Sequence, residues 1–273
     1  MLVDLSEKVK EISEGHTSKG NQPKWHSGDW WYKADHMGYE ALSEVLVSRL
    51  LAYSGVNSYV SYEPVTIRDE SGVFTGCRSR NFKQCDEMLV PLERLYRAYC
   101  GQSLAKKLAA FKEAEERIRF TTEFVESVTK ITDFGQYLSV LLELDAFTLN
   151  EDRHTNNIAV IRNEETGKYR LCPVFDNGLA FLSDVKDYLV GKDMYETIAR
   201  VEAKPFSCDF MEQMEAAANL YGGRLYFHIT RREVDRLFDG LEEYYSSEIL
   251  DRVRSLLFEQ MRKFQYLFRR DEF

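Results

Sequence analysis

The 273-residue sequence has little that would place it in a membrane, in the secretory pathway or in an oxidising compartment. No apolar run approaches the roughly 18 residues that a membrane-spanning helix needs. The start of the chain, residues 1–7, is acidic and lacks the basic and apolar regions of a signal peptide. The five cysteines of the whole sequence are scattered and form no C-x-x-C pair, which fits neither a disulfide scaffold nor a zinc site. We therefore expect a cytoplasmic protein, although secretion by a signal-less route fits the same features.

An excess of positive charge is also missing. The 36 Lys and Arg residues against 45 Asp and Glu give a net charge of −9, which argues against a broad basic surface for nucleic acid. The hydrophobic share of 44% and the charged share of 30% are typical of a globular protein. We see no internal repeat or low-complexity segment. The chain is long enough for one large domain or two lobes.

The most informative stretch runs from Asn150 to Gly178. It contains Asp-Arg-His-Thr-Asn-Asn at 152–157 and Val-Phe-Asp-Asn-Gly at 174–178. Strand-like runs at 158–161 and 169–172 flank a turn-like Glu-Glu-Thr-Gly, so the segment between the two motifs is predicted to be a β-hairpin. A hairpin brings its ends together, and we expect Asp152 and Asn157 to face Asp176 there. Two carboxylates and an amide in one place suit phosphoryl transfer from a metal-bound nucleotide.

Each polar residue of these motifs has a predicted role. Asp152 orients or deprotonates the acceptor hydroxyl, and Asn157 and Asp176 bind Mg²⁺. Arg153 stands beside the catalytic carboxylate and could hold the loop by pairing with another carboxylate. His154 is a structural hydrogen-bonding residue or a proton carrier. Asp, Asn and their neighbours also cap helices and form turns, so either motif alone would be weak, and it is the pairing of the two that indicates chemistry.

The spacing of these residues resembles that of protein kinases, in which an Asp, four residues and an Asn precede a second Asp beyond a hairpin. Asp176 follows Asn157 by 19 residues, in Phe-Asp-Asn-Gly. The order Asp-Arg-His-x-x-Asn resembles the phosphatidylinositol kinases and the bacterial HipA-type serine/threonine kinases. The resemblance covers roughly residues 15–260 and implies a two-lobed kinase fold, ATP, Mg²⁺ and a protein Ser or Thr acceptor. No A-P-E motif follows Asp176, which departs from eukaryotic protein kinases.

A lysine and a glutamate nearer the N-terminus fit the same chemistry. Lys33 lies in the aromatic-rich, strand-like run 29–34, and apolar spacing predicts a helix over 38–53. In two-lobed kinases a strand lysine contacts the nucleotide phosphates and is held by a glutamate of the next helix. Glu44, in the middle of that helix, is the expected partner, and Glu40, one turn earlier, is the alternative. Both charges could instead be ordinary exposed ones.

The polar, glycine-containing segment 15–25 precedes the Lys33 strand. Its residues Ser18, Lys19 and Gly20 could fold over phosphates through backbone N–H groups, or the segment could be an ordinary surface loop. The resemblance makes Ser18 the nearest candidate for self-phosphorylation. It also implies a stand-alone kinase domain, because only about 15 residues precede this loop where HipA toxins carry an extra N-terminal domain. An antitoxin-type partner therefore stays open.

The fold class we predict is α+β, a two-lobed kinase-like fold with a small β-rich N-terminal lobe (1–88) and a larger, mostly helical C-terminal lobe (89–273). A short helix is expected at 4–14, a β-meander at 57–82 and a polar linker at 79–89. Helices are expected at 91–99, 103–130, 134–149, 209–220, 230–240 and 246–269. Asp133-Phe134-Gly135 spells D-F-G but precedes Asp152, so we assign Asp133 to capping the helix at 134–149.

Three functions remain open. The first is a protein serine/threonine kinase with ATP and a protein substrate as its partners. The second is a kinase for a small molecule or lipid, although no basic, apolar membrane-docking stretch is visible. The third is a non-catalytic nucleotide-binding interaction protein. Against this third function, every catalytic position holds a residue type that is competent for catalysis. The acceptor, the oligomeric state and a toxin or effector role do not follow from the sequence.

Overall fold

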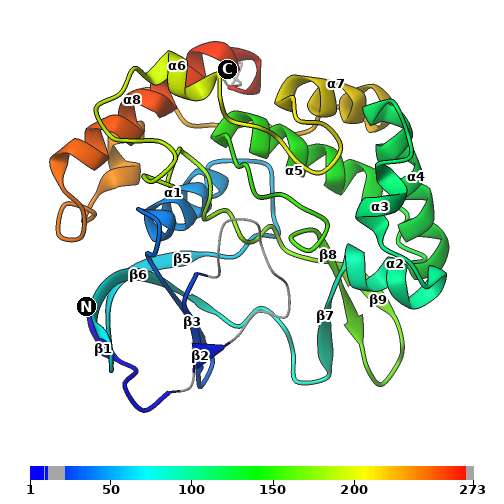
Figure 1. Ribbon diagram of the computed structural model, residues 1–273, viewed down its shortest axis with the longest axis horizontal. Coiled ribbons are helices and arrows are strands. Elements are labelled where there is room, and N and C mark those ends of the chain that lie inside the picture. Colours follow the sequence, from blue (N-terminus) through cyan, green and yellow to red (C-terminus); the bar gives the residue numbers. More distant parts are fainter. Residues whose placement is uncertain (9, 12–21, 269–273) are drawn as a thin grey trace. The chain divides into compact units, whose positions relative to one another are not determined.

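The computed structural model describes residues 1–8, 10–11 and 22–268 (Figure 1). The predicted phosphate-loop residues Ser18, Lys19 and Gly20 lie outside the described residues. The chain forms two compact units. The first comprises Met1–Asn81, Asp176–Arg200 and Tyr226–Phe273, and the second comprises Phe82–Phe175 and Val201–Leu225.

These units do not follow the predicted boundary between residues 88 and 89, so the division into lobes stays a prediction. Two later segments join the first 81 residues because they bind the helix α1 (Glu40–Leu51) and the residue before it. The Tyr39 hydroxyl donates to the Phe181 carbonyl at 2.9 Å. Arg49 Nη1 donates to the carbonyls of Leu237 at 2.5 Å and Asp239 at 3.0 Å.

The first unit contains a six-stranded sheet in the order β1-β5-β6-β4-β3-β2 (Figure 1). Its strands are β1 (Leu2–Asp4), β2 (Lys10–Glu11), β3 (Lys24–Ser27), β4 (Trp30–Ala34), β5 (Tyr62–Asp69) and β6 (Gly72–Arg80). All pairs are antiparallel except β1 with β5. The predicted strand at 29–34 is confirmed, and β5 and β6 confirm the core of the predicted meander. In the turn between them Asp69 Oδ1 accepts from the backbone N–H groups of Ser71 and Gly72.

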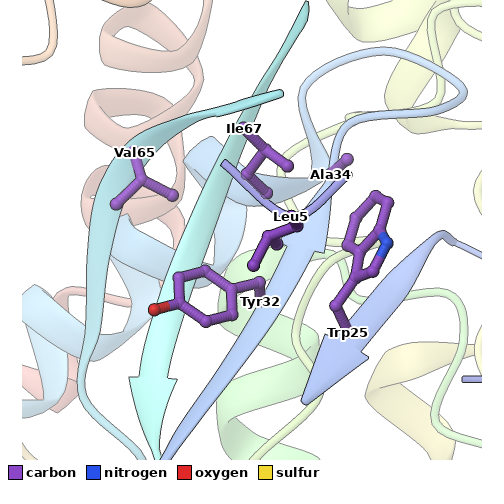
Figure 2. Close-up of a cluster of buried hydrophobic side chains, with 6 residues drawn as sticks. All are labelled: Leu5, Trp25, Tyr32, Ala34, Val65 and Ile67. Carbon is purple, nitrogen blue, oxygen red and sulfur yellow. The ribbon is translucent and has the colours of Figure 1, made fainter. Parts of the chain in front are cut away.

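A hydrophobic cluster covers one face of this sheet. Figure 2 shows its buried side chains side by side, and they are Leu5, Trp25, Tyr32, Ala34, Val65 and Ile67. Because side chains alternate along a strand, Lys33 projects from the opposite face to its neighbours Tyr32 and Ala34. This alternation separates the apolar core of the sheet from Lys33.

The predicted helix at 4–14 is wrong. Residues 2–4 form β1, and Lys10–Glu11 form β2. Parallel pairing aligns Leu2 with Thr66, and the Leu5 N–H donates to the Arg68 carbonyl at 2.7 Å. Leu5 is 2% exposed within the sheet cluster. Pairing with the β5 edge therefore satisfies this backbone and buries its leucine, which outweighs a weak helical spacing.

Helix α1 confirms the helix predicted over 38–53. Its first turn is held by two carboxylates. Glu40 accepts from the N–H groups of Met37 at 2.7 Å and Gly38 at 3.0 Å, and Asp35 accepts from Ala41 N–H at 2.7 Å. The other helices in the described part of the unit are α6 (Met194–Ile198), α8 (Ser247–Lys263) and the 3-10 turns η1 (Val234–Phe238) and η2 (Gln265–Leu267). The predicted helices at 230–240 and 246–269 are thus shorter than expected.

The second unit combines a three-stranded sheet, β7-β8-β9, with five helices in its described residues. The elements are β7 (Glu87–Pro91), β8 (Ala159–Asn163), β9 (Tyr169–Leu171), α2 (Leu92–Cys100), α3 (Leu104–Leu108), α4 (Ala114–Thr129), α5 (Phe134–Thr148) and α7 (Phe210–Tyr221). Strands β8 and β9 confirm the predicted hairpin. The predicted linker at 79–89 contains part of β7, and the helix predicted over 103–130 is broken, because a reciprocal capping box of Glu113 and Glu116 starts α4.

Helix α5 is the buried helix that the sequence predicts. Asp133 occupies its N-cap position as predicted, but its side chain makes no capping hydrogen bond. A Cβ on Gly135 would lie 2.5 Å from the Tyr221 ring, and glycine therefore allows α5 and α7 to pack closely. No helix in the described ranges combines the length and apolar character needed to cross a bilayer.

Candidate active site

The first group of candidate residues lies in the first unit around Lys33. The Lys33 side chain extends from β4 and is only 11% exposed. Its ammonium forms an ion pair with the fully buried Glu44 of α1 and a second one with Asp176 Oδ1 at 2.7 Å. A strand, the helix that follows it and a segment 143 residues beyond Lys33 therefore meet at one cation. Glu40 instead binds backbone N–H groups at the start of α1, so of the two alternatives it is Glu44 that pairs with Lys33.

Glu44 also holds the segment that contains Asp176. The Asn177 N–H donates to Glu44 Oε2 at 2.9 Å, while the other carboxylate oxygen faces Lys33. Asp176 adopts a left-handed backbone conformation with a φ of 57°, which is uncommon for a residue with a side chain. One buried carboxylate thus orients both the lysine and the turn at Asp176.

Electrostatics keeps this lysine charged. Burial lowers the pKa of Lys33, but the carboxylates of Asp176 and Glu44 outweigh burial, and the pKa is raised well above its ordinary value. The ammonium lies 5.4 Å from the centre of the Tyr62 ring, which adds a cation–π contact. Burial raises the pKa of Tyr62 as well, so the phenol beside Lys33 stays neutral.

The second group lies in the second unit, in the loop between α5 and β8. The Arg153 side chain is fully buried and pairs with the fully buried Asp145 of α5, with Nε 2.9 Å from Oδ2. Arg153 Nη1 also donates to the carbonyls of Asn157 at 3.2 Å and Phe175 at 2.9 Å. One guanidinium therefore joins the two ends of the β8–β9 hairpin. Arg153 holds the loop and does not reach solvent.

Asp152 lies beside this support and has a small exposed surface, 13% of its side chain. Asn157 Nδ2 donates to the Asp152 carbonyl at 2.8 Å and to Oδ2 at 3.2 Å. His154 Nε2 is 3.7 Å from Oδ2, which is beyond hydrogen-bonding distance. Lys204 Nζ, from another segment of the unit, lies 3.8 Å from Oδ1. The carboxylate is therefore oriented by an amide and has the side chains of His154 and Lys204 on either side at 3.7 and 3.8 Å.

The residue types fit Mg²⁺, which is held by one or two carboxylates together with substrate phosphates. The Asn157 amide nitrogen faces Asp152, so its oxygen is turned away and is the atom that a cation would use. Nowhere in the described residues do three or more His, Cys, Asp or Glu side chains form a metal-binding group. Asp176 belongs to the first unit and Asn157 to the second, and their convergence stays a prediction.

Sequence reasoning missed two residues of the second group. Asp145 was included in an apolar helix, although a carboxylate between Leu144 and Ala146 in a buried face signals a buried partner. Lys204 has no comparable signal, because its neighbours Ala203 and Pro205 do not indicate a role. Its position beside Asp152 comes from the tertiary fold alone.

Taken together, these elements form a mixed α+β, kinase-like fold with a β-sheet in the N-terminal part and a mainly helical C-terminal part. Among solved structures, the chain is similar to the crystal structure of a Helicobacter pylori proinflammatory kinase, CtkA. The TM-score is 0.64 and the sequence identity 15%, and the match covers 96% of this chain and 95% of that chain. No protein-family model and no curated protein matches the chain. At this identity the likeness shows the fold alone, so the resemblance to HipA-type kinases is supported only as far as a kinase-like fold.

Proposed function

We propose that this chain is an ATP-dependent kinase that phosphorylates a serine or threonine of a protein, as the resemblance to HipA-type kinases implies. The observation that carries the proposal is the buried Lys33 ammonium held between Glu44 and Asp176. A strand lysine, a helix glutamate and a metal-binding Asp are the parts that kinases require together. One carboxylate would be enough to neutralise a purely structural lysine. A second carboxylate adds a negative charge, and burying a charge without its own partner is costly.

On the nucleotide side, Lys33 contacts the α- and β-phosphates. Its raised pKa keeps the ammonium protonated, and Glu44 fixes its direction. A lysine held in place gains more from a phosphate than a mobile one, since the entropy of ordering its side chain is lost on folding and not on binding. Asp176 and Asn157 would hold Mg²⁺, which neutralises phosphate charge when bound.

On the acceptor side, Asp152 orients the hydroxyl and receives its proton. The acceptor oxygen forms a bond to the γ-phosphorus, and the bond from that phosphorus to the β–γ bridging oxygen breaks. ADP leaves with the electron pair of the broken bond. The buried pair of Arg153 and Asp145 keeps the loop rigid, so that Asp152 meets the hydroxyl in a fixed geometry.

The experiment that tests the proposal is transfer of label from [γ-³²P]ATP with Mg²⁺. The full chain is assayed for label on itself and on casein as a generic protein acceptor, beside Asp152→Ala and Asp176→Asn. Glu63→Gln is a matched control, because Glu63 is an exposed carboxylate of β5. We expect wild type and the control to transfer label and both site variants to lose about 10²-fold or more.

Phosphoamino-acid analysis of the labelled protein then gives the acceptor class, and label on serine or threonine is expected. Label that persists in Asp152→Ala and Asp176→Asn would contradict the assigned residues. Transfer of label to a small hydroxyl compound, with no label on protein, would support a phosphotransferase activity but contradict the proposal that the acceptor is a protein.

A further inference from the structure

A segment with no role in the proposed function, residues 203–208, reaches the Asp152 carboxylate in the second unit. Lys204 Nζ lies 3.8 Å from Asp152 Oδ1. The Lys204 side chain is about one-third exposed, at 34%, whereas the Asp152 side chain is 13% exposed. A partly exposed lysine therefore stands beside the group that the proposed function assigns to the acceptor hydroxyl.

The backbone on both sides of Pro205, directly after Lys204, is held by a fully buried glutamine of α7. Gln213 Nε2 donates to the Lys204 carbonyl at 3.1 Å, and Gln213 Oε1 accepts from the Phe206 N–H at 3.3 Å. The Ala203 N–H donates to the Cys208 carbonyl at 2.9 Å and closes the segment into a loop. One side-chain amide thus fixes the loop from both sides.

A second anchor comes from α4. Arg117 Nη1 donates to the Phe206 carbonyl at 2.6 Å, and its Nη2 donates to the Phe111 carbonyl at 2.8 Å. The Phe206 side chain is fully buried. Helices α4 and α7 therefore place the Lys204 backbone with little freedom, although the ammonium itself is near solvent.

The ion pair between Lys204 and Asp152 is weak. Its separation of 3.8 Å exceeds a hydrogen bond, and a partly exposed pair of this kind contributes little to stability. A lysine on a rigid backbone with a partly exposed side chain is suited to bind an anion beside Asp152. In a phosphotransferase the anion at that position is the group being transferred.

Resting on the proposed function, we propose that Lys204 is a further catalytic residue, which contacts the phosphoryl group as it passes to the acceptor oxygen. The step is the one given above. The Lys204 ammonium stabilises the charge on the non-bridging oxygens while the hydroxyl proton goes to Asp152. The contact strengthens as the acceptor bond forms, so it acts on kcat more than on ATP binding.

The test uses the full chain with Mg·[γ-³²P]ATP and records label on protein and release of inorganic phosphate. Lys204→Met, Lys204→Arg and the control Lys168→Met, at an exposed lysine of the same unit, are compared with wild type. Titration calorimetry measures ATP binding. We expect Lys204→Met to lower kcat about 10²-fold, with the Kd for ATP changed less than about twofold. Lys204→Arg should recover part of the loss, and Lys168→Met should match wild type.

A second comparison separates direct contact from an action through Asp152. In an Asp152→Asn background, Lys204→Met should still cost about 10-fold, because the phosphoryl group remains to be contacted. No further loss there would make Lys204 a positioning residue for Asp152 and overturn the proposal.

The outcomes distinguish this proposal from the function it rests on. If wild type is active and Lys204→Met is equally active, the proposed role of Lys204 is wrong, while the proposed kinase function still stands. A wild type that neither transfers label nor hydrolyses ATP overturns the proposed function, and the role of Lys204 falls with it. A loss in Lys204→Met that appears as weaker ATP binding, with kcat unchanged, also contradicts the transfer role.

Discussion

The Lys33 ammonium lies 2.7 Å from Asp176 Oδ1, although 143 residues separate the two in the chain. The same ammonium is paired with the fully buried Glu44. These contacts bring a strand, a helix and the Phe-Asp-Asn-Gly turn to one point, and they give the kinase-like fold a site of defined charge. The predictions below follow from this site and from the buried support of the second unit.

Replacing Glu44 by glutamine should reduce both stability and activity. The change leaves Lys33 with one carboxylate in a buried environment, and loss of a buried partner costs about 3–5 kcal/mol when no other charge compensates. Because Asp176 remains, we expect a loss near the lower end, about 3 kcal/mol, in the free energy of unfolding by urea. Label transfer should fall by about 10²-fold. Equal stability and activity in Glu44→Gln would show that the pair has no role.

The pair of Asp145 and Arg153 should behave as a unit. Asp145→Asn leaves a fully buried guanidinium without its carboxylate, and we expect a loss of about 3–5 kcal/mol in the free energy of unfolding. Asp145→Leu combined with Arg153→Met removes both charges and should recover much of that loss. Urea unfolding of Asp145→Leu, Arg153→Met and the double variant measures the coupling. Additive effects would contradict the interpretation of a coupled pair.

Cysteine reactivity should separate two classes in the native protein. Cys85, Cys100 and Cys208 are exposed, while Cys77 and Cys172 are buried. Burial raises the pKa of Cys172 to about 12 and that of Cys77 well above its ordinary value, so neither forms a thiolate at neutral pH. Timed labelling with iodoacetamide, mapped by mass spectrometry, should modify the exposed group first. Full labelling in urea is the control, and early labelling of Cys77 would contradict the packing of β6.

The acid side of the stability profile should depend on Glu87. Arg170 donates to both oxygens of its carboxylate at 2.7 Å, and these hydrogen bonds lower the pKa of Glu87 from 4.5 to about 2. A lowered carboxyl pKa stabilises the fold above about pH 4.5, and this stability is lost as the pH falls towards about 2. Because Arg170 is 43% exposed, we expect only about 1 kcal/mol.

Glu87→Gln tests this pH dependence. The difference in unfolding free energy between wild type and variant should be present near neutral pH and shrink below about pH 4. The control Glu63→Gln changes a more exposed carboxylate, which also pairs with an arginine. A Glu87→Gln difference that stays constant between about pH 6 and pH 2 would contradict the assignment.

Local patterns in the sequence predicted much of what positions the site. Aromatic content predicted the strand of Lys33, and helical spacing predicted α1 with Glu44 in its middle. Turn residues predicted the β8–β9 hairpin between Asn157 and Asp176. These features depend on neighbours a few residues away, which is the range over which propensity and periodicity carry information.

Other features depended on distant partners and could not be predicted locally. The segment at 4–14 has apolar residues at helical spacing, but the edge of β5 offered its backbone better hydrogen bonds. The role of Asp145 depends on its ion pair with Arg153 in the following loop. The position of Lys204 matters because Asp152, in another segment of the unit, lies beside it. Such contacts appear only once the chain has folded.

The measurement that tests the central claim most directly is calorimetric titration of the full chain with ATP, with and without Mg²⁺, beside Lys33→Met and Asp176→Asn. The account predicts that wild type binds ATP, that Mg²⁺ strengthens binding, and that Lys33→Met weakens it about 10-fold or more. Asp176→Asn should lose the effect of Mg²⁺. The account would be contradicted by a folded wild type that binds no ATP. It would also be contradicted if both variants bound ATP as tightly as wild type.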